Sequence, residues 1–160
     1  MWNRTFTCLA VTLFAATLGT SHAMAENLEI KRWNPKGLSE PKGYSQVVTI
    51  KGDHKEIRLG GKAGLTADGK IPESLAEQVK LTFDNITLAL KDAGAEPKDV
   101  VEIQVFIVDL DKIDPTPVYE GIRNYFPAGH KPVSMVLGVS ALAIPALKWE
   151  INVVAVVPDK

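Results

Sequence analysis

The sequence feature that most constrains the fold is the run LKWEINVVAVV at residues 147–157. Its residue pattern is that of a strand with two largely apolar faces. Successive side chains of a strand point to opposite faces. One face is apolar, whereas the other carries Glu150 and Asn152 before it becomes apolar at Val154 and Val156. Such a strand is typical of the centre of a sheet covered on both sides. We therefore predict a central strand whose two polar side chains need partners or a wet cleft.

Periodicity predicts further strands and two helices along the chain. Strands are expected at 44–50 and 56–61, joined as a hairpin by a turn at 51–54, and at 100–110 and 134–139. A helix is expected at 72–93, with Pro72 in its first turn and Gly94 just beyond its end. A second helix follows Pro117. The apolar stripes of the helices consist of Leu75, Val79, Phe83, Ile86 and Leu90, and of Val118, Ile122 and Phe126.

These elements occur in the order ββαβαββ, which predicts an α+β fold with a mixed sheet and both helices packed on one face. The other face of the sheet would then expose Val, Ile and Ala side chains from several strands. A monomer rarely exposes an apolar surface of that size. We therefore expect several copies of the chain to pack these faces together in a homo-oligomer.

The first 25 residues have the features of a secretory signal peptide. Arg4 precedes an apolar run, and Ala23-Met24-Ala25 has the small-x-small pattern of a cleavage site. We expect cleavage after Ala25, or alternatively after Ala23, which leaves a domain at 26–160 that begins with an N-terminal arm at 26–43. An uncleaved anchor is disfavoured because the run is shorter than the roughly 20 residues of a spanning helix. The expected location is the periplasm or the medium.

Charge and composition exclude several classes of partner. The chain has 18 basic and 19 acidic residues, which gives no basic footprint for nucleic acid or, after signal removal, for a membrane. The single cysteine, Cys8, is lost with the signal peptide, so no disulfide is expected. We expect no metal, because His54 and His130 lack ligands at suitable spacing, and no cofactor, because no phosphate-binding glycine pattern occurs.

A set of short motifs is spread over nearly the whole mature chain. They are GYSQ at 43–46, LGG at 59–61, AG at 93–94, VVEIQVFIVDL at 100–110, YF at 125–126, KPVS at 131–134 and WEINVVAV at 149–156. Their order and spacing resemble the RidA/YjgF family of small enamine and imine deaminases, although no single motif is strong. The resemblance implies a RidA/chorismate-mutase-like trimeric barrel, a homotrimer with small-molecule clefts between its subunits.

The resemblance also implies roles for individual residues. Glu150 matches the catalytic glutamate that positions the water attacking an imine, which yields ammonia and a carbonyl compound. Val133 occupies the position of an arginine that grips the substrate carboxylate, and it lacks the bidentate fork of that side chain. We therefore expect poor activity on 2-imino acids. The implied substrate-binding positions are Tyr44, Gly60, Gly61, Tyr119, Val133 and Met135.

Several of these residues also have structural explanations. Tyr44 could cap the core with a wet hydroxyl, and Gly60 and Gly61 could form a bulge. Met135 could pack in the core or in an interface, and Glu150 could be a solvated residue at the start of a strand. Lys131 could supply the missing charge, although a loop lysine is more often solvated. Two hypotheses therefore remain open: hydrolysis of a reactive imine or enamine, and non-catalytic binding of a small molecule in the same cleft. Ribonuclease activity is disfavoured by the acidic balance.

Overall fold

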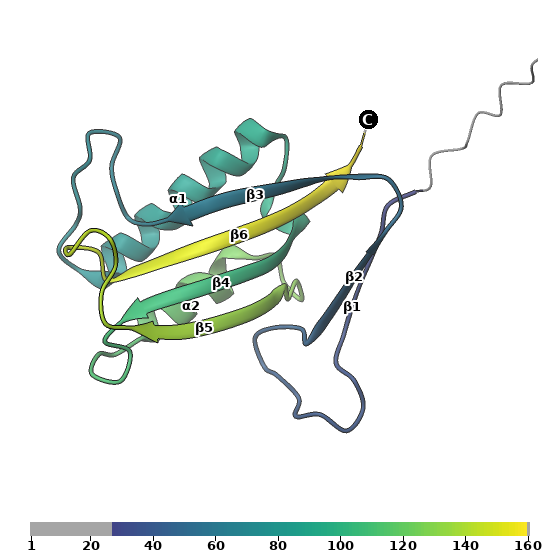
Figure 1. Cartoon of the computed structure of the whole chain (residues 1–160), viewed down its shortest axis with the longest axis horizontal. Helices are drawn as coiled ribbons and strands as arrows, with labels where there is room; N and C mark the ends of the chain where they lie inside the picture. The colour runs from purple at the N-terminus through teal and green to yellow at the C-terminus, as the bar shows by residue number, and fades with distance from the viewer. Residues whose placement is uncertain (1–26, 160) are drawn as a thin grey trace, which may run out of the picture.

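The computed structural model describes residues 27–159, so the expected signal peptide lies outside the described residues. The chain folds into two helices and mixed sheets, which confirms the predicted α+β class (Figure 1). No helix in the described part of the chain is long and apolar enough to cross a membrane. The elements are β1 (Glu29–Trp33), β2 (Val47–Lys51), β3 (His54–Lys62), α1 (Leu75–Ala93), the 3-10 helix η1 (Pro97–Asp99), β4 (Val100–Val108), α2 (Thr116–Tyr125), β5 (Val133–Val139) and β6 (Trp149–Pro158).

The larger sheet has the strand order β3-β6-β4-β5. Strands β4 and β5 run parallel, and the other neighbours are antiparallel. The prediction of a central strand is confirmed, because β6 lies between β3 and β4. Its residues Trp149, Ile151 and Ala155 are fully buried. Both helices lie on the face to which these side chains point, as expected (Figure 1).

The first two strands form a separate two-stranded sheet, which diverges from the larger sheet (Figure 1). The predicted hairpin between 44–50 and 56–61 is wrong, because β2 pairs with β1 from Glu29↔Lys51 to Trp33↔Val47. Strand β3 pairs with β6 instead, where Ile57 is buried in the core. The N-terminal arm thus contains a strand that sequence analysis missed, since Lys31 and Arg32 interrupt its apolar pattern.

Helix α1 carries the predicted apolar stripe, and Val79, Phe83, Ile86 and Leu90 are buried. The helix begins later than predicted, at Leu75, because the Ser74 side chain accepts a hydrogen bond from the Glu77 backbone N–H and serves as the N-cap. Gly94 ends it in the left-handed conformation, with φ 80°. The stripe packs on β6, where the rings of Phe83 and Trp149 lie 5.6 Å apart.

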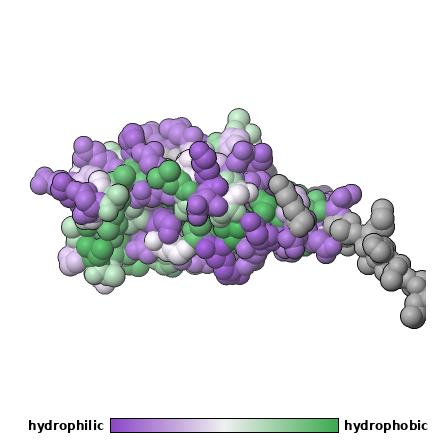
Figure 2. Space-filling model, turned by 90° about the horizontal axis from the view of Figure 1, so that it is seen from above, coloured by the Kyte–Doolittle hydropathy of each residue, from purple (hydrophilic) through white to green (hydrophobic). Residues whose placement is uncertain are grey.

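The face of the sheet opposite the helices is less apolar than predicted. Beside apolar residues it carries Glu102, Gln104, Glu150 and Asn152, all half-buried. The Gln104 amide donates to Glu102 over 2.8 Å, and the Asn152 amide donates to Gln104 over 3.4 Å. The side of the molecule seen from above is also mixed, with apolar patches interrupted by hydrophilic residues (Figure 2). The uniformly apolar face from which assembly was predicted is therefore not present in the described part of the chain.

Candidate functional site

Glu150 lies on the open face of β6, next to Gly61 at the end of β3. The β3–β6 register shifts between Leu59 and Lys62, so Gly60 and Gly61 lie in the irregular segment. A Cβ built on Gly61 would lie 2.6 Å from Glu150 Cδ and closer still to Oε1. No side chain fits at Gly61 while the carboxylate holds this position. The two glycines therefore lie in an irregular segment of β3, where Gly61 leaves room for the Glu150 side chain.

The Glu150 carboxylate makes no hydrogen bond or ion pair with any described residue, although the side chain is only half exposed. Glu102, elsewhere on the same face of the sheet, differs, because its Oε1 accepts a hydrogen bond from Gln104. Both oxygens of Glu150 are therefore available to water or to a ligand. A carboxylate in this state can orient a water molecule and accept its proton.

Val133 and Met135 lie on the same open face but at the edge strand β5. Val133 pairs with Glu102, whereas Glu150 pairs with Phe106, which in turn pairs with Leu137. Leu137 lies four residues beyond Val133 on β5, a distance of about 13 Å at roughly 3.3 Å per residue. One chain therefore does not bring Val133 near Glu150.

Tyr44 and Tyr119 line a hollow of about 430 Å³ on the helix side of β5. The parallel register places Ser134 and Val136 on this side of the strand, opposite to Val133 and Met135. The structure therefore divides the predicted residues into three groups. Glu150 lies with Gly61 and Gly60, Val133 lies with Met135, and Tyr44 lies with Tyr119.

The hollow beside β5 is held in shape by contacts between loops. The Ser45 backbone N–H donates to Pro132 O over 3.2 Å, and the Ser45 hydroxyl donates to Lys131 O over 2.7 Å. The His130 ring lies tilted against Phe126, with ring centroids 5.5 Å apart, and its Nε2 donates to Val100 O over 2.8 Å. Burial lowers the pKa of His130 below its ordinary value, which favours a neutral ring.

Sequence analysis missed two of the three basic residues in this hollow. Lys42 comes from the loop before Tyr44, and Arg123 comes from the exposed side of α2. Lys131, which sequence analysis considered as a source of charge, lies there too. Isolated basic residues in a loop and on a helix carry no sequence signal, because their convergence depends on tertiary structure.

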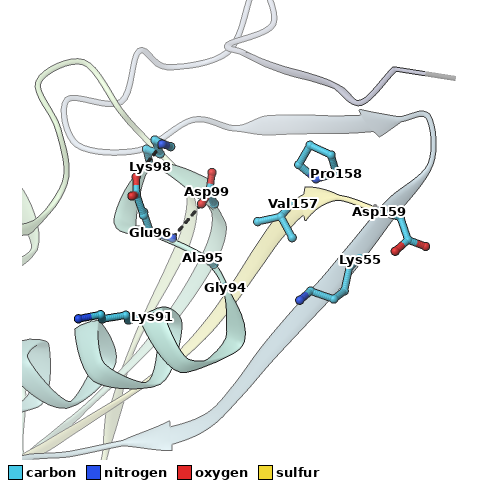
Figure 3. A pocket seen from close by; sticks show the side chains of 10 residues that line it. All are labelled: Lys55, Lys91, Gly94, Ala95, Glu96, Lys98, Asp99, Val157, Pro158 and Asp159. Atoms are coloured by element: carbon cyan, nitrogen blue, oxygen red, sulfur yellow. Dashed lines mark hydrogen bonds and ion pairs between the residues drawn. The ribbon is translucent and has the colours of Figure 1, made fainter. Parts of the chain in front are cut away.

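A different hollow, of about 610 Å³, lies at the C-terminal end of α1 and contains none of the predicted site residues (Figure 3). Its basic and acidic groups neutralise one another: Lys98 forms an ion pair with Glu96 at 2.6 Å. Lys55 donates to Ala93 O over 2.8 Å. This hollow therefore offers no clear preference for a charged ligand. No group of three His, Cys, Asp or Glu side chains that could hold a metal occurs within residues 27–159.

The fold and the carboxylate define a class: a small α+β domain that presents, on a sheet face, a glutamate without a partner among residues 27–159. The model of the family described as endoribonuclease L-PSP matches residues 37–157. The chain belongs to this family, which is also known as the RidA/YjgF family, so the suspected relationship is confirmed.

Relatives of known sequence support this assignment. The chain is 32% identical to a RutC family protein of Aquifex aeolicus over 131 residues, which cover 80% of this chain and 98% of that protein. It is 29% identical to the RutC family protein YjgH of Escherichia coli over 106 residues, with 64% of this chain and 76% of that protein covered.

The fold also matches solved structures. A protein of unknown function of the conserved Rid family, YyfB from Yersinia pestis, superposes with a TM-score of 0.73 at 24% identity. The match covers 80% of this chain and 98% of that one. RidA from an Antarctic Psychrobacter superposes with a TM-score of 0.59 at 22% identity, covering 74% and 92% of the two chains. These likenesses establish the fold.

Proposed function

We propose that this chain hydrolyses a reactive imine or enamine to a carbonyl compound and ammonia. The observation that carries the proposal is the Glu150 carboxylate, which lies over Gly61 and has no partner among the described residues. Membership of the RidA/YjgF family supports a small-molecule role for such a site.

In the proposed reaction, Glu150 takes a proton from water while the water oxygen bonds to the imine carbon. Protonation of the nitrogen then allows the C–N bond to break, which leaves a C=O group and releases ammonia. An enamine enters the same path after it tautomerises to the imine. The overall balance is one imine and one water consumed for one carbonyl compound and one ammonia formed.

The proposed cleft lies between subunits of a homotrimer. Glu150 is about 13 Å along the sheet from the row of Val133, so the β5 of a neighbouring copy would have to supply Val133 and Met135. Exposure on β5 supports this arrangement, because Met135 is 45% and Leu137 is 40% exposed. From the signal-like N-terminal sequence, we place this trimer outside the cytoplasm, in the periplasm or the medium.

The second candidate function is non-catalytic binding of a small molecule in the same cleft. Val133 favours it, because a valine at this position cannot pair with a substrate carboxylate. The two functions differ in a single measurable respect, which is turnover.

The test compares wild type with Glu150→Gln on neutral imines and on 2-imino acids generated in the assay, with ammonia release as the readout. We expect turnover of a neutral imine that falls at least about a hundredfold in Glu150→Gln, the magnitude typical of a lost general base. Glu102→Gln is the matched control, because it alters a carboxylate of the same face and should retain activity. Ligand binding by wild type without ammonia release would establish the binding function and overturn the hydrolase.

A further inference from the structure

The N-terminal half of α1 carries polar side chains beside its apolar stripe. Gln78, Thr82 and Asn85 lie four and three residues apart, so they share one side of the helix. Gln78 and Thr82 are fully buried, and Asn85 is half-buried. This side of α1 faces the loops that leave β3 and enter β6, at the end of the sheet where the helix begins (Figure 1). Because a buried amide is costly without hydrogen bonds, the partners of these side chains define the contacts that α1 makes here.

The Gln78 side chain connects α1 to the segment immediately before Glu150. Its Nε2 donates to Pro72 O over 2.8 Å and to Ala146 O over 2.9 Å. Its Oε1 accepts a hydrogen bond from the Lys148 backbone N–H over 2.9 Å. Both the donor and the acceptor atom of the amide are therefore used. An apolar residue at this position would leave three backbone groups without their partner on α1.

The same part of α1 also binds the segment that follows Gly61. The Asn85 amide donates to the two backbone carbonyls that flank Gly64, over 3.1 and 2.8 Å. Gly64 itself packs directly against the helix backbone, because a Cβ there would lie 2.6 Å from Gln78 Cα. Helix α1 thus contacts the chain shortly after Gly61 and shortly before Glu150.

Regular strand pairing does not set the position of Glu150 relative to Gly61. The pairing of β3 with β6 is regular up to Leu59 and resumes, with a shifted register, at Lys62. Gly61 lies in this irregular stretch, and Glu150 lies one residue before Ile151, the partner of Lys62. Strand β4 pairs with β6 on the other side of Glu150. On the β3 side, the two segments are connected through α1.

We propose that Gln78 is a positioning residue for Glu150. It acts through the backbone at Lys148 and not by contact with a substrate, because it is fully buried on the helix side of the sheet, opposite to the carboxylate. The inference rests on the proposed function, in which Glu150 activates water, and assigns the contact that keeps the carboxylate over Gly61. A misplacement of about 1 Å can lower a rate about a hundredfold even when the altered residue lies away from the chemistry. Gln78 therefore affects the rate of turnover and not the binding of substrate.

The test compares Gln78→Met with wild type in the full mature protein. Methionine is similar in length and apolar, so it removes the side-chain hydrogen bonds without opening a large cavity. With a neutral imine as substrate and ammonia release as the readout, we expect kcat to fall by at least about tenfold and KM to change by less than about threefold. Crystal structures should find the Glu150 carboxylate displaced from its position over Gly61. A variant with wild-type kcat and an unmoved carboxylate would overturn the proposal.

Thr82→Val is the matched control. It removes another buried hydrogen bond of α1, from the Thr82 hydroxyl to Gln78 O over 2.7 Å, which joins two residues of the helix and reaches neither loop. We expect wild-type kcat and an unmoved Glu150 carboxylate in this variant. An equal loss of kcat in Thr82→Val and Gln78→Met would mean that general loosening of α1 is responsible, which contradicts the proposed role. Thermal unfolding of each variant confirms that folded proteins are being compared.

Amide hydrogen exchange of the wild-type protein tests the contact without a variant and without turnover. The Lys148 N–H should exchange about as slowly as that of Ile86 in the core of α1, because Gln78 Oε1 binds it. Rapid exchange at Lys148 beside slow exchange at Ile86 would overturn the proposal, even if Gln78→Met did not fold. A different result separates the two proposals: no ammonia release by wild type, together with a carboxylate displaced only in Gln78→Met, would refute the hydrolysis and support the positioning of Glu150.

Discussion

At the scale of single residues, the candidate site depends on one close approach. Glu150 can lie on the open sheet face because Gly61, on the neighbouring strand, has no Cβ. A larger residue at position 61 would force the carboxylate to another rotamer. The glycine is therefore part of the site's geometry, although it contributes no functional group.

Gly61→Ala should displace the Glu150 carboxylate without unfolding the protein, because the group that must move is the end of a flexible side chain. We expect a stability change within about 0.5 kcal/mol, together with a loss of imine hydrolysis that approaches that of Glu150→Gln. Crystal structures and rate measurements provide the check. Gly60→Ala is the matched control, because a Cβ there meets nothing within 4 Å. An unmoved carboxylate in Gly61→Ala would contradict the argument.

The sequence predicted Glu150 as unusual, because a carboxylate in an apolar strand calls for an explanation. It did not predict which residues lie near Glu150, since Gly61 is far away in the sequence and meets it only through β3–β6 pairing. Arg123 and Lys42 were missed for the same reason. The chemical type of a residue can be read from its position in the sequence. Which residues lie close together in space depends on how the strands pair.

At the scale of elements, the predicted helices and most strands were confirmed within a few residues because their apolar periodicity is strong. The error was in pairing: β2 takes β1 as its partner, and β3 takes β6. A short turn between two strands favours a hairpin in any sequence-based prediction. It cannot reveal that a better partner for β3 lies about a hundred residues later in the chain.

The packing of α1 against α2 depends on Gly121. A Cβ there would lie 2.9 Å from Phe83 Cε2 and closer still to Val79. We expect Gly121→Ala to lower the free energy of unfolding by about 1–3 kcal/mol through overpacking, despite the better helix propensity of alanine. Chemical denaturation measures the change. Gly43→Ala, where a Cβ would meet nothing within 4 Å, should have little effect on stability. If the free energy of unfolding of Gly121→Ala equals that of wild type, α1 and α2 can move apart without loss of stability, which contradicts the prediction.

At the scale of the whole molecule, the edge strand β5 is the surface that most needs a partner. Within residues 27–159, its outer side makes a backbone contact only at the isolated bridge between Ser45 and Val133. The rest of the strand exposes backbone hydrogen-bonding groups together with apolar side chains, a combination that favours association with another chain. The polar open face of the sheet does not favour association in this way, so the proposed trimer depends on contacts made by β5.

Leu137→Lys should therefore weaken assembly while the individual chain still folds. Leu137 is already 40% exposed in the single chain, so a lysine there costs little in the monomer but places a charge in the proposed interface. Light scattering at micromolar concentration should find a trimer for wild type and smaller species for the variant. Leu88→Lys, at a position on α1 that is 67% exposed, should remain trimeric. A wild-type monomer under these conditions would refute the assembly.

The central position of β6 also has a consequence for the time at which the protein can fold. Strand β6 is the last element in the sequence, yet it joins β3 to β4. Until β6 leaves the ribosome, the sheet cannot form across its middle, and contacts so distant in sequence are slow to form. The growing chain should therefore stay open during synthesis. An open chain is the form that a narrow export channel accepts, so this topology is compatible with the export that we propose from the N-terminal sequence.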